Sequence, residues 1–378
     1  MIAHPRPLIE VFADIPDFRK AKGKRHPLPA LLSLACCAML CGYRSYGAIA
    51  DWGRNYGAPL AHALGFTHNT PCAATLCTIF GRLDHEAFAS QGGAWADSVV
   101  AHTPAAPETP PEALAVDGKT LRGSKKHGAP GTHLLSVLSQ RLGLTLEPQA
   151  VDAKTNEMKA IETVLAHIVL QGRVLTMDAL LTQRPVAQTI VDKGGDYVMI
   201  VKENQPKRKE EIELVFTRPP AGDRQESVRT VDMGHGRIET RQRTTSEALV
   251  GYSDGPGLAQ VFAVGRHVIT KKTGQERAEM VYGVTSLSPE QADPGRLLEL
   301  VRGHWGIENK SHGVRAVPFD ADRSQVRRGH IPQLMAALRN MAIGLLRRAG
   351  YTNIAKACRL MAAQPAKALA LIGIEFEN

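Results

Sequence analysis

The segment that decides the predicted fold is residues 113–124, ALAVDGKTLRGS, in which a short apolar run ends on an acidic residue. Such a run is typical of a strand that is buried on both faces of a sheet. A second run, RVLTM at residues 173–177, ends in the same way on Asp178. Between and after these runs, stretches with helical periodicity alternate with strand-like stretches. This alternation predicts an α/β core whose first part is residues 114–209.

The first hundred residues are predicted to form an all-α domain. Apolar side chains recur at helical spacing in residues 28–43, with Pro27 and Pro29 suited to a helix start and Gly42 to its end. This run is shorter than the roughly 20 residues of a membrane-spanning helix, which favours a buried helix. No segment resembles a targeting signal, so we expect a cytoplasmic protein that is associated with the nucleoid.

Composition changes along the rest of the chain indicate further divisions. Pro and Ala dominate the expected linker, residues 210–288 are strand-like, and the stretches at 290–303 and 331–372 have helical patterns. The expected domains are a helical N-terminal domain at 1–100, a linker at 101–113, the first part of the core at 114–209, a β-rich insertion at 210–288, the rest of the core at 289–348, and a basic helical tail at 349–378.

The charge balance suggests a polyanionic partner. The chain has 46 Lys and Arg against 37 acids, a net charge of +9, and residues 302–359 alone hold eleven basic residues and three acids. Such a surplus indicates DNA, although a solvated helix face is the alternative for a single charged run. The six cysteines form no CxxC pair, so we interpret them as reduced thiols and not as disulfides or a zinc site.

Three acidic residues have the sequence context of metal ligands. Asp117 and Asp178 each end an apolar strand, and Glu308 lies in helical surroundings in the segment HWGIENK. Two strand-end carboxylates and one from a helix can together bind one or two Mg²⁺ ions, which activate a hydroxyl nucleophile and stabilise the leaving oxygen of a phosphodiester. Taken singly, Asp117 before Gly118 is also typical of a turn, and Glu308 of a solvated helix face.

Six short blocks follow one another in an order that resembles a known family. They are AVDGKTLRGS, NEMKAIETVL, LTMDALLTQ, GGDYVMIVKENQP, GHGRIETR and HWGIENKSH. Their spacing resembles that of the bacterial insertion-sequence transposases of the ISAs family, which includes the H-repeat-associated proteins. Residues 11–52 also resemble the helical domain in front of that family's catalytic core, so the resemblance covers roughly residues 8–350.

The resemblance implies an α/β fold with an RNase-H-like catalytic core and a β-rich insertion between the second and third acids. It implies that Asp117, Asp178 and Glu308 are the DDE triad and the ligands of Mg²⁺, for which Mn²⁺ can substitute. The partners would be the terminal inverted repeats of the element and target DNA, bound by a homodimer on paired ends, with no membrane involved. The reaction would be phosphodiester hydrolysis at the element ends, followed by strand transfer.

Residues expected to bind DNA come from the family motifs and from the basic surplus. Those that match the family or flank its acids, together with the basic cluster after Glu308, are Lys119, Arg122, Lys202, Asn204, Gln205, Arg237, His304, Trp305, Asn309, Lys310, Arg315, Arg327 and Arg328. Two of them have structural alternatives, since Trp305 can orient its helix from the core and His304 can be a hydrogen-bonded structural histidine.

The chain departs from the family pattern just after Glu308. The family's Trp, Leu, Asp and first Glu are replaced here by Gly313, Arg315, Ala316 and Ala321, and Pro318 does not suit a continuing helix. These departures leave two alternatives to an active transposase open. One is an inactive or domesticated DNA-binding relic, and the other is a metal-dependent DNA nuclease that cleaves without joining.

Overall fold

The computed structural model describes most of the chain in two compact units. The described residues are 6–103, 109–120, 133–151, 157–234, 236–307, 313–314, 318–324, 326 and 329–376. The first unit comprises Met1–Thr109, Gly118–Ile168 and Ile307–Asn378, and the second comprises Pro110–Asp117 and Val169–Gly306. The chain therefore combines a helical N-terminal region, a large mixed sheet and C-terminal helices, which confirms the predicted α/β class. In the described residues no helix is long and apolar enough to cross a membrane.

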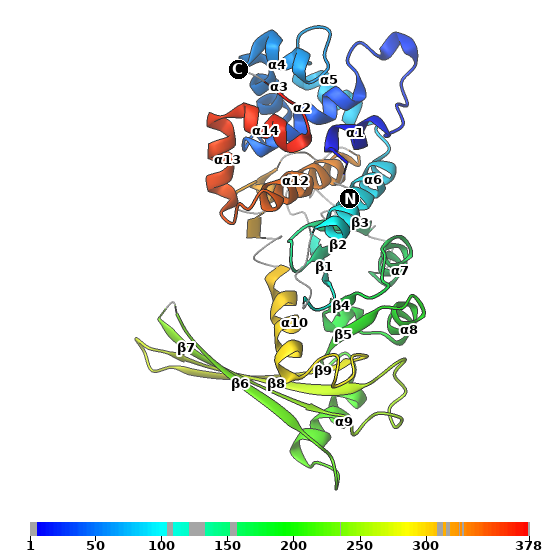
Figure 1. Cartoon of the computed structure of the whole chain (residues 1–378), viewed down its shortest axis with the longest axis vertical. Helices are drawn as coiled ribbons and strands as arrows, with labels where there is room; N and C mark the ends of the chain where they lie inside the picture. Colours follow the sequence, from blue (N-terminus) through cyan, green and yellow to red (C-terminus); the bar gives the residue numbers. More distant parts are fainter. Residues whose placement is uncertain are drawn as a thin grey trace, which may run out of the picture. The chain divides into compact units, whose positions relative to one another are not determined.

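The first unit is mainly helical, and Figure 1 shows its first helices in blue and its last in orange and red. Its helices are α1 (Leu8–Ala13), α2 (Leu28–Leu40), α3 (Tyr46–Asn55), α4 (Gly57–Ala63), α5 (Ala73–Phe80), α6 (His85–His102), α7 (Glu157–His167), α12 (Ile331–Arg348), α13 (Ile354–Ala363) and α14 (Pro365–Ile372). It also contains the antiparallel strands β2 (His133–Ser139) and β3 (Thr145–Val151). Helices α6, α7 and α12 all pack against β3.

Helix α2 is the centre of the first unit. Every residue of α2 except Pro29 is buried, and α1, α3, α12, α13 and α14 pack around it, as expected for a helix that is apolar on all sides. The helix ends at Leu40, and two residues later Gly42 has a φ of 85°, in the left-handed region. The Tyr43 amide donates to the Ala38 carbonyl at 2.9 Å and the Gly42 amide to that of Met39, so that the last carbonyls are satisfied. The predicted helix and its stop signal are confirmed.

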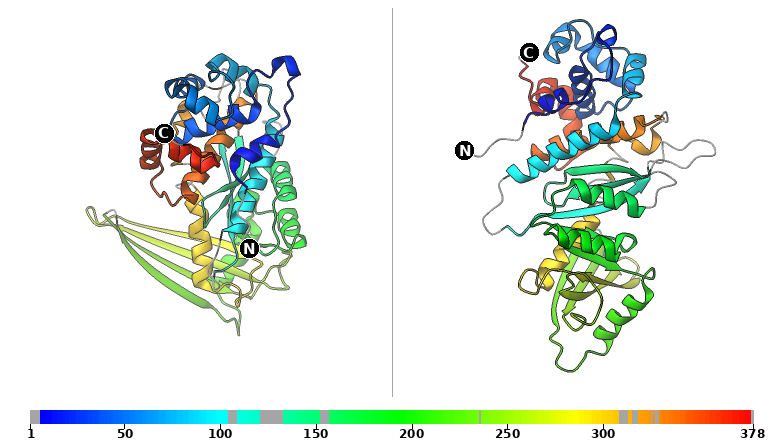
Figure 2. Two further views of the ribbon diagram at one scale, coloured as in Figure 1. Left: turned by 45° about the horizontal axis from the view of Figure 1, so that its top comes forward. Right: turned by 90° about the vertical axis from the view of Figure 1, so that its right-hand side faces the viewer.

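The second unit is built on a mixed sheet. Its strands follow the order β1 (Ala113–Thr120), β4 (Val174–Met177), β5 (Asp196–Val201), β9 (Glu276–Thr285), β8 (Gln260–Thr270), β7 (Arg237–Ser246) and β6 (Glu226–Gly234). Strands β1, β4 and β5 are parallel, whereas β6–β9 form a long antiparallel ribbon that Figure 2 shows in green and yellow. The helices are α8 (Arg184–Asp192), α9 (Pro206–Thr217) and α10 (Pro294–Ile307).

Two details of the second unit differ from the prediction. Strand β1 does not end at Asp117 but continues to Thr120. The segment predicted to be β-rich from residue 210 begins with α9 and becomes strand only at Glu226. The sequence of α9, PKRKEEIELVFT, has Pro in its first turn, several strong helix formers, and buried Ile212 and Val215 three residues apart. These features favour a short helix with one buried face.

Helix α10 covers one face of the ribbon. Leu297, Leu298 and Val301 of α10 share an apolar cluster with Phe262 and Val264 of β8. The Phe262 ring lies over Gly283, where a Cβ atom would collide with the ring and come within 2.6 Å of the Met199 carbonyl oxygen. A side chain at position 283 would therefore force β5, β8 and β9 apart.

A buried arginine lies beside this cluster. Arg243 of β7 has no exposed surface, and its guanidinium lies 4.5 Å from the centre of the Phe262 ring. Within the described part of the chain, none of its three guanidinium nitrogens has a hydrogen-bond partner. Burial lowers the pKa of Arg243 to about 9. An unpaired buried charge costs roughly several kcal/mol, while a desolvated cation–π contact returns only about 2 kcal/mol.

We therefore expect Arg243→Met to stabilise the protein by about 1–3 kcal/mol, because a well-packed apolar side chain replaces an unpaired charge. The folded-state pKa lies below that of the unfolded chain, so deprotonation relieves the wild-type cost as the pH rises. The stability gap between the variant and the wild type should thus narrow as the pH rises through about 9. Thermal and urea unfolding at pH 7 and pH 10 measures both effects.

The matched control is Arg241→Met, two residues away on the same face of β7. Arg241 is paired with Asp232 at 2.8 Å and with Glu239 at 2.6 Å, so its removal should destabilise the protein by about 1 kcal/mol. Destabilisation of similar size by both substitutions would show that Arg243 is satisfied in solution.

Candidate active site

Two of the three predicted acids lie side by side where the pairing of β1 with β4 ends. Strands β1 and β4 are parallel, and their register pairs Val116 with Met177. Asp117 and Asp178 are the next residues of the two chains, so they occupy neighbouring positions, as predicted. Both are partly buried, as suits ligands held by a rigid strand edge beside solvent.

The Asp178 carboxylate forms an ion pair with Lys202. One of its carboxylate oxygens accepts a hydrogen bond from the Ala179 amide, and the Lys202 ammonium lies 3.0 Å from the same oxygen. Partial burial by itself raises the pKa of Asp178, but the Ala179 amide and Lys202 outweigh burial, and the pKa lies below its ordinary value. Asp178 is therefore ionised at neutral pH and can ligate a metal ion.

The segment that follows β5 forms hydrogen bonds with the segment that follows β4. The Asn204 side-chain amide donates to the Ala179 carbonyl at 2.7 Å, and that of Gln205 donates to the Thr182 carbonyl. The Thr182 hydroxyl is buried and donates to the Ile200 carbonyl at 2.7 Å. Each side-chain amide thus uses one of its two N–H donors on the backbone near Asp178, and contact of Asn204 and Gln205 with DNA stays a prediction. Sequence spacing could not reveal this, since an amide serves a carbonyl or a phosphate equally well.

His304 also differs from the expectation of a phosphate contact. Its ring is only 6% exposed, and Nδ1 lies 3.1 Å from the Thr176 hydroxyl oxygen. Burial lowers the pKa of His304, so the ring is neutral at neutral pH. Trp305 is half-buried and packs against the apolar cluster of α10 and β8, which fits the alternative that it orients its helix. His304 therefore belongs to the protein interior, whereas contact of the partly buried Trp305 with DNA stays a prediction.

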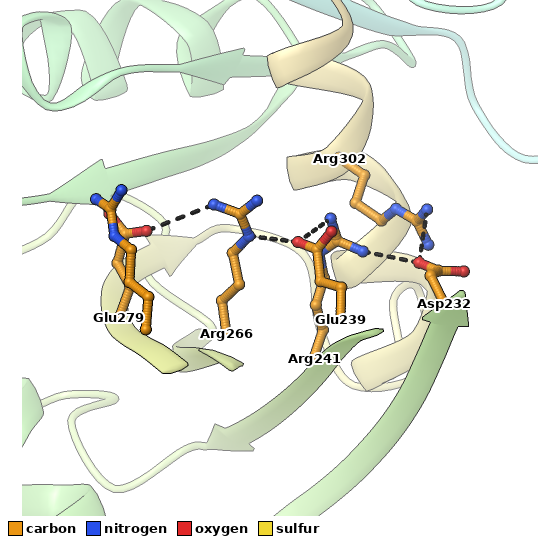
Figure 3. Close-up of polar contacts among 7 residues, drawn as sticks. Asp232, Glu239, Arg241, Arg266, Glu279 and Arg302 are labelled. Atoms are coloured by element: carbon orange, nitrogen blue, oxygen red, sulfur yellow. Dashed lines mark hydrogen bonds and ion pairs between the residues drawn. The ribbon is translucent and has the colours of Figure 1, made fainter. Parts of the chain in front are cut away.

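A ladder of alternating charges joins α10 to the ribbon (Figure 3). Its members, which we call the charge ladder, are Arg277, Glu279, Arg266, Glu239, Arg241, Asp232 and Arg302. Four cations face three acids, so this face has little charge left for a polyanion. Its last contact, between Arg302 of α10 and Asp232 of β6, spans 3.2 Å, and both side chains are almost half exposed. Exposed pairs of this kind contribute about 0–1 kcal/mol each.

Several predicted site residues lie outside the described residues. They are Arg122, Glu308, Asn309, Lys310, Arg315, Arg327 and Arg328, and for Lys119 only the backbone is described. Arg237 is exposed at the start of β7. In the part of the chain that the structure describes, no three metal-ligating side chains gather. The carboxylates of Asp117 and Asp178 are an oxygen-donor pair that suits Mg²⁺, and Glu308 would be the third ligand.

Comparison with protein families identifies the family to which a chain with this pair of acids belongs. Residues 108–345 match the model of the transposase DDE domain, and residues 9–96 match that of the region associated with this domain. The chain belongs to the DDE transposase family. Residues 97–107, which overlap the predicted linker at 101–113, separate the two matched regions. The protein is thus a DDE-type transposase of the insertion-sequence kind, as the H-repeat resemblance indicated.

Curated relatives are similar to this transposase over most of their length. "Putative transposase YncI" of Escherichia coli O157:H7 is 29% identical over 90% of this chain and 87% of its own. "H repeat-associated putative transposase YhhI" of Escherichia coli K12 is 27% identical over 90% of both chains. "Uncharacterized protein in dhlA 3'region" of Xanthobacter autotrophicus is 34% identical over 70% of this chain and 88% of its own.

The altered stretch of the transposase is partly described. Phe319 and Ala321 are buried, and Asp320 between them has a left-handed φ of 47° and lies 3.7 Å from Arg44. A carboxylate in place of Ala321 would be buried and would need a partner. The small apolar side chain of Ala321 needs no such partner and therefore suits this buried position.

The ion pair between Lys202 and Asp178 leads to a prediction about metal binding. Lys202→Met should lower the Mg²⁺ concentration needed for half of the metal-induced rise in Tm by about two- to fivefold, because the ion no longer competes with an exposed ammonium. A Mg²⁺ titration followed by thermal unfolding measures this change.

Lys207→Met is the matched control, because it removes the same charge from an exposed position on α9. An equal shift in both variants would mean that net charge, and not the contact with Asp178, sets the affinity for Mg²⁺.

Proposed function

We propose that this transposase cleaves phosphodiester bonds at the ends of its element and joins the freed 3′-hydroxyl to target DNA, with Asp117, Asp178 and Glu308 as its catalytic residues. The observation that carries the proposal is the β1–β4 register, which brings Asp117 and Asp178 to one strand edge in a chain of the DDE family. Glu308, which directly follows the last residue of α10 in the sequence, is the third acid.

The core is proposed to be RNase-H-like. Strands β1, β4 and β5 are parallel, and the antiparallel pair β2 and β3 lies between β1 and β4 in chain order. A helix, α7, precedes β4, and another, α8, connects β4 to β5. The ribbon β6–β9 then separates the second acid from the third, as an insertion would.

The carboxylates of Asp117, Asp178 and Glu308 would hold the metal ions, which we propose to be Mg²⁺ or Mn²⁺. Bound there, the ions supply activation of a water or 3′-hydroxyl and stabilisation of the leaving oxygen. The protein's own part is to hold the acids in place. The Ala179 amide fixes one oxygen of Asp178, and Asn204 and Gln205 fix the segment that follows it. Lys202 balances the charge of Asp178, and we propose that its exposed ammonium contacts a phosphate of the DNA.

From the DNA substrate that the family implies, we propose specific partners for this chain. The partners are the terminal inverted repeats of the element and target DNA, bound by a homodimer on paired ends in the cytoplasm or on the nucleoid. The basic surplus of residues 302–359 supports DNA binding without reading sequence. Of the predicted contacts, all except the buried His304 remain DNA-binding candidates: Lys119, Arg122, Lys202, Asn204, Gln205, Arg237, Trp305, Asn309, Lys310, Arg315, Arg327 and Arg328.

The proposal is tested by removing charge from each acid without changing its shape. Asp117→Asn, Asp178→Asn and Glu308→Gln should each lower Mg²⁺-dependent cleavage of terminal-repeat DNA by at least about 10³-fold, the scale seen when one member of an interdependent catalytic set is removed. DNA affinity should persist, because these groups act on the transition state. Cleavage assays beside gel-shift titrations measure both.

Asp192→Asn is the control, since this exposed aspartate ends α8 and contacts only Gln188 in the described structure. Cleavage by Glu308→Gln at the wild-type rate would exclude Glu308 as the third acid. A wild-type protein that binds the repeats but never cleaves them would instead be a DNA-binding protein.

Charge removal at Arg327 and Arg328 should have the opposite effect. The double variant Arg327→Ala, Arg328→Ala should bind DNA more weakly, with a log–log salt slope shallower by about 0.9 for each phosphate that the protein no longer neutralises. Cleavage at saturating DNA should survive, because peripheral arginines bind substrate and transition state alike. Arg54→Ala, which removes an exposed arginine from α3, is the control. An unchanged slope in the double variant would place its arginines away from DNA.

A further inference from the structure

Three elements of the second unit meet at one buried hydroxyl. The Thr176 hydroxyl of β4 donates to the Leu114 carbonyl of β1 at 3.2 Å, and its oxygen lies 3.1 Å from Nδ1 of His304 on α10. Thr176 is 1% exposed and His304 is 6% exposed. We call this set of contacts the threonine tie. Leu114 and Thr176 lie three and two residues before Asp117 and Asp178, and His304 lies four residues before Glu308.

The protons of the threonine tie can be assigned. A hydroxyl has one proton, and that of Thr176 is donated to the Leu114 carbonyl. Both contacts are hydrogen bonds at once when Nδ1 of His304 carries a proton, and on this ground we assign the ring the Nδ1–H tautomer. A neutral imidazole that donates a hydrogen bond can be buried at little cost in free energy. The hydrogen bond also fixes the orientation of the ring relative to α10.

We propose that His304 is a positioning residue that holds α10 in register against β1 and β4, and so fixes the point at which the chain leaves α10 toward Glu308. The inference rests on the proposed catalytic role of the three acids. One buried hydroxyl is shared by the strand of the first acid, the strand of the second, and the helix that precedes the third. A rotation or slip of α10 would break the hydrogen bond between His304 and Thr176.

The other contacts of α10 are less suited to this role. Arg302 reaches Asp232 of the charge ladder, but water competes for both groups because they are nearly half exposed (Figure 3). Arg296, near the start of α10, donates to the Pro111 carbonyl at 3.2 Å, also at an exposed position. The apolar cluster holds α10 against the ribbon, but apolar contacts are not directional. The threonine tie is the buried directional contact among them.

The test compares variants that differ only in the hydroxyl. Thr176→Val keeps the branched shape and removes the hydroxyl, whereas Thr176→Ser keeps the hydroxyl and removes a methyl group. In the full-length protein, Thr176→Val should lower cleavage of terminal-repeat DNA by about 10- to 100-fold, the scale seen when a group that orients catalytic ligands is removed. DNA affinity should stay within about twofold of wild type. Thr176→Ser should stay within about threefold of wild type in cleavage.

Hydrogen exchange of the α10 amides gives a readout that does not depend on activity. We expect residues 301–307 to exchange about tenfold faster in Thr176→Val but not in Thr176→Ser or in Asp232→Asn, which weakens the exposed contact to Arg302. His304→Asn and His304→Leu are a second pair, because an asparagine amide can donate near the position of Nδ1 and leucine cannot. His304→Asn should therefore be less impaired than His304→Leu in both measurements.

Each outcome supports or overturns the proposal. Wild-type exchange and cleavage in Thr176→Val, or equal impairment in Thr176→Val and Thr176→Ser, would overturn it, because the hydroxyl would then not matter. If Thr176→Val fails to fold, equal exchange in the two His304 variants would overturn it. If the wild-type protein never cleaves DNA, the proposed function fails while the exchange experiment still decides whether the threonine tie holds α10.

Discussion

The parallel pairing of β1 with β4 is the constraint on which the rest of the site depends. Four residue pairs, from Ala113 with Val174 to Val116 with Met177, fix the two strands in one register. Asp117 and Asp178 come directly after the last pair of this register, so the strand pairing makes them neighbours. A slip of one residue would turn one carboxylate toward the opposite face of the sheet.

The contacts around Asp178 are of two kinds: hydrogen bonds that are costly to break, and one ion pair that another ion can replace. Asn204 and Gln205 bind backbone carbonyls, and the Thr182 hydroxyl is fully enclosed, so these bonds are costly to break. The Lys202 ion pair is half exposed and contributes only about 0–1 kcal/mol. A divalent ion or a phosphate can therefore replace this contact without disturbing the loop. The same motif, Lys-x-Asn-Gln, thus supplies one exchangeable charge and two fixed supports.

Sequence patterns predicted the elements of the site better than the partners of its side chains. The apolar runs before Asp117 and Asp178 predicted both strands, and the helical spacing of residues 28–43 predicted α2, because periodicity reports burial directly. The contacts of Asn204, Gln205 and His304 were not predictable in the same way. Each side chain can donate to a carbonyl, a hydroxyl or a phosphate, and residues far apart in the sequence decide which one is near. The start of the ribbon was misplaced because the charged sequence of α9 gives an ambiguous pattern beside strands.

Burial explains why charged residues of the second unit divide into two groups. In the charge ladder, cations and acids neutralise one another on a partly exposed face, so each contact is weak but none is strained. Arg243 and His304 are both buried, but burial of Arg243 lowers the stability of the fold whereas burial of His304 does not. The histidine is neutral and hydrogen-bonded, which makes its contact directional at low cost, whereas the arginine has only an aromatic ring beside it. A buried polar group can position a helix only when it is satisfied, and among these residues His304 meets that condition while Arg243 does not.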